Sequence, residues 1–185
     1  VFGLDTDRDR VHNIQKKTSY ILDVPGRELA DVVASGHLCA ATTFEVLRTI
    51  DCIIICVPTP LKRKYTPDIT YILSAVRTIR EFIKKDTLVV LESTTYPGTT
   101  EELIKPELEK SGLKSGKDFF LAFSPERIDP GNKTHDVTNI TKVVGGLTPT
   151  SGELTKLLYE QIIKRVHMVS TAKAAEMTKL LENTF

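Results

Sequence analysis

The sequences CIIICV at residues 52–57 and TLVVLE at residues 87–92 decide the fold. Both are continuous apolar runs of strand length. Runs of this kind, without alternation of polar and apolar residues, are typical of strands buried on both faces of a sheet. Between them, residues 69–84 have the apolar spacing of an amphipathic helix. The order strand, helix, strand predicts a parallel sheet in which these two runs are central strands.

The same alternation continues in both directions along the chain. Further strands are expected at residues 1–5, 38–42, 119–123, 142–145 and 166–170. Further helices are expected at residues 8–17, 27–35, 43–49, 99–111 and 149–164, and another begins near Thr171. The predicted fold class is therefore α/β, with a Rossmann-like, doubly wound and mostly parallel sheet.

The first residues, VFGLDTD, form a short apolar run that ends on Asp5. A dinucleotide-binding unit places an acidic residue at such a strand end, beside the adenosine ribose, about 20 residues after a glycine-rich turn. The printed sequence contains no GxG. We expect residues 1–170 to be a dinucleotide-binding domain without its first strand and glycine loop, and residues 171–185 to start a long central helix. Both ends are then cuts in a longer protein.

The charge balance limits the possible partners. Lys and Arg number 25 against 24 Asp and Glu, so no positive excess favours nucleic acid or an anionic membrane. The longest apolar run, residues 52–57, is too short to span a bilayer. We expect a cytoplasmic protein with a small-molecule ligand. No metal is expected, because the 3 Cys and 4 His lack ligand spacing. Cys56 lies in an apolar run, where a thiol is inert.

Polar residues follow several of the predicted strands. Ligands of open α/β sheets bind beyond the carboxyl ends of the strands, so these residues are candidates for a site. They are Asp5 after residues 1–4, Pro58 and Thr59 after residues 52–57, Thr94 after residues 87–92, and Glu126 after residues 119–123. Plainer interpretations stay open: the threonine hydroxyls could bond to local backbone, and Glu126 could simply be solvated.

Eight segments carry a resemblance to a known family. They are VFGLDTD, SYILDV, CVPTPL, PDITYI, ESTTYPGTTEE, SPERIDPGN, KVVGG and AAEMTKLLENTF, in this order along nearly the whole chain. The chain resembles the UDP-glucose/GDP-mannose dehydrogenase family of nucleotide-sugar 6-dehydrogenases. The resemblance implies oxidation of a sugar C6 alcohol to a carboxylate, with two hydrides passed in succession to NAD. The family's nucleophilic cysteine lies in a GFGGxCxPKD-like segment, which the printed sequence lacks, so this piece alone is expected to be inactive.

The resemblance implies that NAD is the cofactor. Asp5 would bind the ribose hydroxyls, Arg10 would lie beside the ribose, and Pro58, Thr59 and Thr94 would lie along the cofactor. A nearby arginine can also accept a 2′-phosphate, so the residues alone leave NADP open.

The resemblance also implies catalytic roles. Thr94 would hold the water for proton transfer and hydrolysis, and Glu126 would be the general base or its partner. Lys179 and Asn183 lie four apart, share a helix face and would stabilise an oxyanion. Spacing alone favours a plainer interpretation for Lys179, a pair with Glu176 or Glu182 on a solvated helix face.

The form SPERIDPGN is similar to the branch of the family that acts on UDP-N-acetylhexosamines. Arg127 in this segment would contact the substrate. UDP-N-acetylglucosamine is the favoured substrate, with UDP-N-acetylmannosamine and UDP-glucose as alternatives, and the product would serve polysaccharide synthesis. Family members dimerise through the long helix, so the complete protein is expected to be a homodimer. The alternative from another class is a short, non-catalytic binder of a dinucleotide or nucleotide sugar.

Overall fold

The computed structural model describes residues 1–21, 23–61, 67–126 and 140–182. The chain divides into two compact units. Among the described residues, the first unit contains residues 1–21 and 23–46, and the second contains residues 47–61, 67–126 and 140–182. The domain boundary expected at residue 170 stays a prediction.

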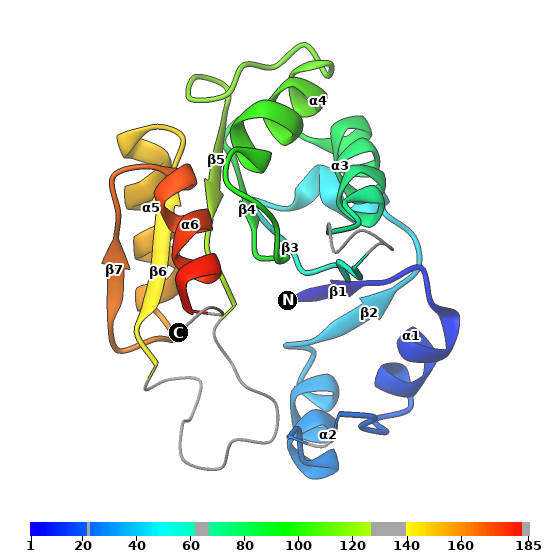
Figure 1. Cartoon of the computed structure of the whole chain (residues 1–185). Helices are drawn as coiled ribbons and strands as arrows, with labels where there is room; N and C mark the ends of the chain where they lie inside the picture. The colour runs from blue at the N-terminus through cyan, green and yellow to red at the C-terminus, as the bar shows by residue number, and fades with distance from the viewer. Residues whose placement is uncertain (22, 62–66, 127–139, 183–185) are drawn as a thin grey trace. The chain divides into compact units, whose positions relative to one another are not determined.

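The first unit is built on a pair of parallel strands (Figure 1). Strand β1 (Phe2–Leu4) pairs with β2 (Cys39–Ala41), and helices α1 (Arg8–Gln15) and α2 (Gly26–Ala34) lie between them in sequence. Asp7 caps α1, because its side chain accepts hydrogen bonds from the backbone N–H groups of Asp9 and Arg10. Val11 is buried and packs α1 against the rest of this unit. This cap and this contact place the turn that carries Asp5.

The second unit contains a five-stranded sheet in the order β3-β4-β5-β6-β7. All neighbouring strands are parallel except β5 and β6, which are antiparallel. The strands are β3 (Cys52–Ile55), β4 (Thr87–Leu91), β5 (Phe119–Phe123), β6 (Lys142–Gly146) and β7 (Val166–Met168). The helices are α3 (Thr70–Phe82), α4 (Lys105–Glu109), α5 (Pro149–Glu160) and α6 (Ala172–Glu182). The predicted α/β class with a mostly parallel sheet is confirmed.

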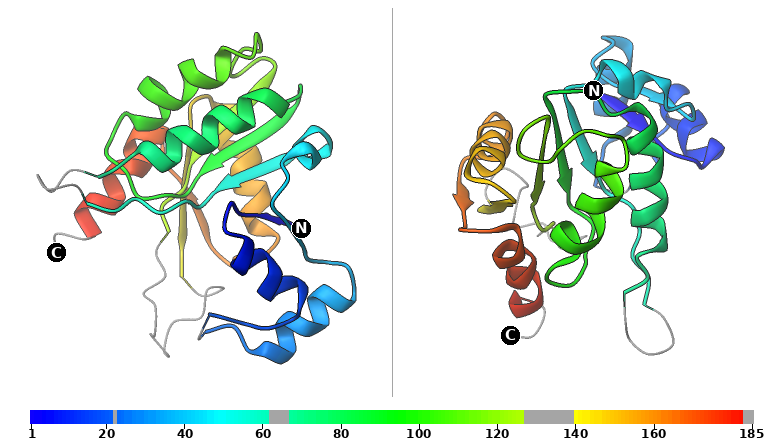
Figure 2. Two further views of the ribbon diagram at one scale, coloured as in Figure 1. Left: turned by 90° about the vertical axis from the view of Figure 1, so that its right-hand side faces the viewer. Right: turned by 90° about the horizontal axis from the view of Figure 1, so that it is seen from above.

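Helices cover both faces of this sheet. Figure 2 shows α5 on one side of the strands and α3 with α4 on the other. The two adjacent glycines of β6 place the last helix: a Cβ on Gly145 would meet Thr171 and Ala175 at the start of α6, and one on Gly146 would meet Gly152 of α5. Since neighbouring strand residues point to opposite faces, α5 and α6 lie on opposite faces. Their backbones pack so closely on β6 that only glycine fits.

The two runs that predicted the fold differ in burial. Every residue of β4 is buried, as expected for a central strand. Strand β3 pairs only with β4 among the described residues, and its Ile54 is 43% exposed while Ile53 and Ile55 are buried. Residues 52–57 were expected to form a central strand, and among the described residues β3 instead lies at one edge of this sheet. An edge position explains the alternating burial.

Two predicted helices have a different form. Residues 43–49 were expected to be helical and contain only a short 3₁₀-helix, η1 (Glu45–Thr49). The helix expected at residues 99–111 is divided into a π-helix, η2 (Thr100–Ile104), followed by α4. Pro106 explains the change, because it has no N–H to donate to the carbonyl of Glu102. The wider π turn occurs directly before this missing hydrogen bond.

Candidate functional site

The carboxyl ends of three strands are level in the second unit. Ile55 of β3 pairs with Leu91 of β4, and Leu91 pairs with Phe123 of β5. Because these strands are parallel, the loops that follow them leave the sheet at the same end, where the strands finish. We call this end the carboxyl edge of the sheet. Four predicted site residues lie in these loops: Pro58 and Thr59 after β3, Thr94 after β4, and Glu126 after β5. The structure therefore brings them to the edge where α/β proteins bind ligands.

A buried lysine lies at the same edge. Lys142 is the first residue of β6, which runs antiparallel to β5, so β6 starts where β5 ends. The Lys142 ammonium donates to Oε1 of Glu92 at 2.6 Å and to Oε2 of Glu126 at 3.4 Å. It also lies 5.0 Å from the centre of the Tyr159 ring. We call Lys142, Glu92, Glu126, Tyr159 and Cys56 the Lys142 cluster.

The remaining members of the Lys142 cluster also bind Glu92. The Tyr159 hydroxyl donates to Oε1 of Glu92 at 2.6 Å, and the Cys56 thiol donates to Oε2 at 3.3 Å. Burial, and then the Glu92 carboxylate, raise the pKa of Tyr159 and raise the pKa of Cys56 to about 12. Cys56 follows β3 rather than lying within it, but its thiol keeps its proton and is a poor nucleophile.

Lys179 faces Glu126 rather than solvent. Its ammonium, on α6, donates to the main-chain oxygen of Glu126 at 2.6 Å. Glu176, one of the acidic partners suggested by spacing, instead binds the backbone N–H groups of Gly98 and Thr100. The interpretation of Lys179 as one half of a pair with Glu176 is therefore wrong. Lys179 of α6 and Glu126 after β5 are far apart in sequence, but they meet at the carboxyl edge of the sheet.

The loops that carry Thr59 and Thr94 are fastened to each other. The Ser93 hydroxyl donates to the main-chain oxygen of Val57 at 2.8 Å, so it ties the loop after β4 to the loop after β3. Thr94 itself is exposed, and Thr59 is half-buried. An exposed hydroxyl at a fixed loop can reach a ligand or a water.

Two predicted site residues, Arg127 and Asn183, lie outside the described residues.

Asp5 and Arg10 meet in the first unit. Asp5 follows β1 and its Oδ1 accepts from the backbone N–H of Asp7 at 2.9 Å, while Oδ2 accepts from Arg10 Nη1 at 3.4 Å. Arg10 also lies 3.5 Å from the Asp7 carboxylate. Asp5 remains partly exposed at the strand end, where its oxygens can accept from the two hydroxyls of a ribose. Because two carboxylates already bind Arg10, this corner suits the uncharged ribose of NAD better than a 2′-phosphate.

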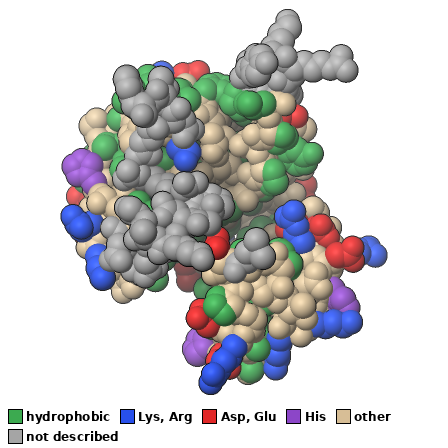
Figure 3. Space-filling view, turned by 60° about the horizontal axis from the view of Figure 1, so that its bottom comes forward, with side chains coloured by type: hydrophobic (Ala, Val, Ile, Leu, Met, Phe, Trp, Pro, Cys, Tyr) green, Lys and Arg blue, Asp and Glu red, His purple; other side chains and the backbone are tan. Residues whose placement is uncertain are grey.

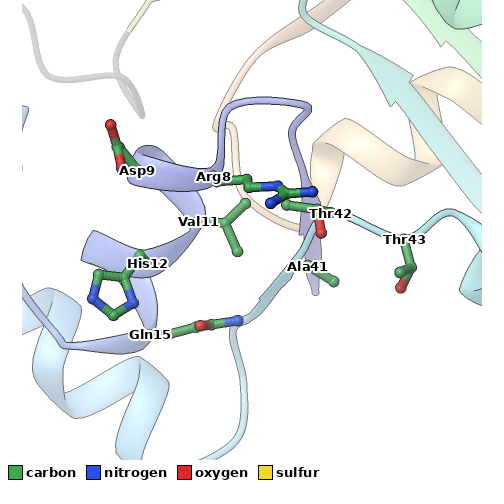
Figure 4. Close-up of a pocket in the computed structure, with 8 residues that line it drawn as sticks. All are labelled: Arg8, Asp9, Val11, His12, Gln15, Ala41, Thr42 and Thr43. Atoms are coloured by element: carbon green, nitrogen blue, oxygen red, sulfur yellow. The ribbon is translucent and has the colours of Figure 1, made fainter.

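A cavity of about 440 Å³ lies between α1 and the end of β2 in the same unit (Figure 4). In the close-up, the Arg8 side chain extends toward Thr42, and Val11 points into the space between helix and strand. The Gln15 amide donates to the main-chain oxygen of Ala40 at 2.9 Å and holds α1 on the strand. Local sequence does not predict this cavity, because its lining is shared between residues about 30 positions apart.

On the face shown in Figure 3, basic and acidic side chains are intermixed among the described residues. In the described part of the chain, no group of three or more His, Cys, Asp or Glu side chains is placed to hold a metal ion. Among the same residues, no helix is both long enough and apolar enough to cross a membrane.

Comparison with protein families gives a match over most of the chain. Residues 1–163 match the NAD-binding domain of the UDP-glucose/GDP-mannose dehydrogenase family. The chain belongs to this family. NAD is the cofactor of this domain. The resemblance carried by the eight sequence segments is thereby confirmed.

Relatives in the family are similar along the entire chain. A UDP-N-acetyl-D-glucosamine 6-dehydrogenase of Pseudomonas aeruginosa is 39% identical over 186 residues, which cover 100% of this chain and 43% of that protein. A UDP-N-acetyl-D-mannosamine dehydrogenase of Pyrococcus horikoshii is 34% identical, over 100% of this chain and 44% of that protein. The chain thus spans less than half the length of these relatives.

Solved structures of dehydrogenases also match this chain over its whole length. The structure of a UDP-D-ManNAc dehydrogenase from Pyrococcus horikoshii matches with a TM-score of 0.94 at 35% identity, over 100% of this chain and 44% of that one. A ternary complex of GDP-mannose dehydrogenase from Pseudomonas aeruginosa matches with a TM-score of 0.91 at 28% identity, with the same coverage. The Rossmann-like fold and membership of a nucleotide-sugar dehydrogenase family are thereby shown.

Proposed function

We propose that the complete protein oxidises the C6 alcohol of a UDP-N-acetylhexosamine, with UDP-N-acetylglucosamine favoured, to the uronic acid. Two hydrides pass to NAD, and the product is a precursor for polysaccharide. The observation that carries this proposal is the position of Glu126 at the carboxyl edge of the sheet, with Lys142 at its carboxylate and Lys179 at its main-chain oxygen. The similarity to UDP-N-acetylhexosamine dehydrogenases supports the substrate class.

The cofactor residues are proposed from the strand ends. Asp5, supported by Arg10, accepts the ribose hydroxyls of the adenosine half of NAD. Pro58, Thr59 and Thr94 line the path of the cofactor past the five-stranded sheet. Bound NAD supplies the hydride acceptor for the oxidation.

The catalytic residues act on the sugar. Glu126 accepts the proton of the C6 hydroxyl, and the exposed hydroxyl of Thr94 holds a water for proton transfer and hydrolysis. The Lys179 ammonium, with Asn183, stabilises the negative oxygen that develops at C6. A well-placed donor of this kind contributes about 3 kcal/mol, or roughly a hundredfold in rate. Arg127 is proposed to contact the substrate.

The state and place of the complete protein are also proposals. We propose that it is a homodimer formed through the helix that begins with α6, on which Met177 and Leu181 are exposed. Exposed apolar side chains on a helix are typical of a surface that a partner covers. We propose a cytoplasmic location on the resemblance to the family.

The proposal is tested by NADH formation with the complete protein. Initial rates are compared with UDP-N-acetylglucosamine, UDP-N-acetylmannosamine and UDP-glucose, and the first should give the highest kcat/KM. Glu126→Gln should reduce kcat at least a hundredfold, since it removes the base. Glu160→Gln on α5 changes an exposed carboxylate in the same way and should leave the rate unchanged. Binding of NAD or a UDP-sugar without any NADH would instead indicate the non-catalytic binder.

A further inference from the structure

We propose that Lys142 is a positioning residue for Glu126, and that Glu92 and Tyr159 hold Lys142 in the place where it does this. The inference rests on the proposed function, in which Glu126 acts on the substrate. Lys142 lies in the segment KVVGG, and the resemblance to the family implies no role for it.

Lys142 carries its charge in a buried position. Its side chain is 7% exposed, and a buried ammonium is costly unless carboxylates and hydrogen bonds compensate its charge. A leucine or valine here would extend the apolar strand β6 without that cost. The lysine is therefore explained by its partners, which are the carboxylates of Glu92 and Glu126 and the face of the Tyr159 ring.

The two carboxylates are not equivalent. Glu92 is 12% exposed and lies 2.6 Å from the ammonium, and it also accepts from Tyr159 and Cys56. It is a fixed, internal partner with its oxygens in use. Glu126 is 44% exposed and lies 3.4 Å from the ammonium. The lysine thus restrains Oε2 of Glu126, while the Glu126 side chain stays partly exposed at the carboxyl end of the sheet.

Hydrogen bonds fix the backbone at the start of β6, from which the Lys142 side chain extends. The N–H of Lys142 donates to the main-chain oxygen of Arg165 at 2.9 Å, and the Ser124 hydroxyl donates to the main-chain oxygen of Val143 at 2.8 Å. The second bond joins the start of β6 to the turn after β5, two residues before Glu126. A restraint anchored in the sheet holds a reactive group more accurately than one on a loop.

Lys179 completes the restraint from the other side. It binds the main-chain oxygen of Glu126, whereas Lys142 binds the carboxylate. One lysine therefore orients the backbone of Glu126 and the other its side chain. A misplacement of about 1 Å at a reacting group can reduce the rate roughly a hundredfold, so loss of either restraint should be visible in kcat.

The test compares Lys142→Met, Lys142→Arg and a matched control in the complete protein. The control is Arg80→Met, because Arg80 also bridges to a largely buried carboxylate, Glu107, at 2.6 Å in the same unit. Lys142→Met should lower kcat about tenfold to a hundredfold and change the KM for NAD less than about twofold. Lys142→Arg should recover part of kcat, and Arg80→Met should keep it.

Two results would overturn the proposal: an unchanged kcat in Lys142→Met, or an equal loss of kcat in Arg80→Met. If Lys142→Met fails to fold, Lys142→Met with Glu92→Gln removes both buried charges together and takes its place. The folded state is checked by circular dichroism.

A second readout does not need activity. Water-soluble carbodiimide with glycinamide modifies carboxyl groups that are free to move into solvent, and the contact with Lys142 holds the Glu126 carboxylate against the protein. Labelling of Glu126, followed by peptide mass spectrometry, should be several times faster in Lys142→Met than in the wild type and unchanged in Arg80→Met. Equal labelling in all three proteins would refute the restraint. Faster labelling of Glu126 in Lys142→Met, combined with a wild-type protein that reduces no NAD with any UDP-sugar, would refute the proposed function alone.

Discussion

Glu176 of α6 is a buried carboxylate whose removal should destabilise the second unit. The side chain has no exposed surface, and its oxygens accept from the N–H of Gly98 at 2.5 Å, the N–H of Thr100 at 2.9 Å and the Thr100 hydroxyl at 2.6 Å. These groups lie at the start of η2, where backbone N–H groups have no partner within the helix. The carboxylate therefore serves as a cap supplied by a distant helix.

The expected loss follows from the groups left behind. In Glu176→Ala, two buried N–H groups and a hydroxyl lose their acceptor, and each unsatisfied buried group costs about 1–3 kcal/mol. A water entering the space left by the carboxylate would satisfy some of them. We expect the free energy of unfolding to fall by about 4 kcal/mol. Glu176→Gln should lose less, because one amide oxygen still accepts, but its NH₂ cannot accept from the backbone.

The measurements are urea denaturation and amide hydrogen exchange of residues 98–100 by mass spectrometry. Protection of these amides should disappear in Glu176→Ala, while exchange in β4 should be affected only through the global loss of stability. Glu160→Ala removes an exposed glutamate from α5 and should change stability by less than about 0.5 kcal/mol. A loss below about 1 kcal/mol in Glu176→Ala, with unchanged protection at Gly98 and Thr100, would refute the argument.

Three further predictions concern other parts of the chain. Burial and the Glu92 carboxylate raise the pKa of Cys56 to about 12 from the ordinary 9.0, so at about pH 8 its thiolate is roughly a thousandfold scarcer than that of an ordinary cysteine. Iodoacetamide should therefore alkylate Cys56 correspondingly slowly. Alkylation of Cys56 as fast as in the urea-unfolded chain would contradict this. Gly145→Ala should cost about 1–3 kcal/mol in urea denaturation, because the new Cβ would clash with the main-chain oxygen of Thr171. Gly26→Ala, whose new Cβ meets nothing within 4 Å, is the control that should cost much less. Asp5→Ala should weaken NAD binding about tenfold or more by calorimetry with the complete protein, since a charged acceptor for the ribose is lost, and unchanged affinity would remove Asp5 from the cofactor site.

Local sequence was sufficient for much of the fold. Strand β5 was predicted with the observed bounds, Phe119–Phe123, because FFLAF is an apolar run between polar turns. The edge position of β3 could not be predicted, since a continuous apolar run does not reveal how many neighbours the strand has. The π turn of η2 depends on Pro106, a signal that was present in the sequence and not used.

The candidate site was predicted in part. Thr94 and Glu126 were placed at one sheet edge from their positions after strands, and the structure has them there. Lys142 was missed, because a single lysine at the start of an apolar strand is typical of a solvated strand end. Its partner Glu92 lies 50 positions earlier, and the antiparallel pairing of β5 with β6 brings the two together. A contact set by strand register leaves no local pattern.

The stoichiometry of NAD reduction tests the central proposal most directly. The complete protein is given a limiting amount of UDP-N-acetylglucosamine with excess NAD, and NADH is measured at completion beside the mass of the sugar product. Oxidation of the C6 alcohol to a carboxylate predicts two NADH for each sugar and a product with a uronic acid. One NADH for each sugar would mean that oxidation ends at the aldehyde, and no NADH with any of the three UDP-sugars would contradict the proposed activity.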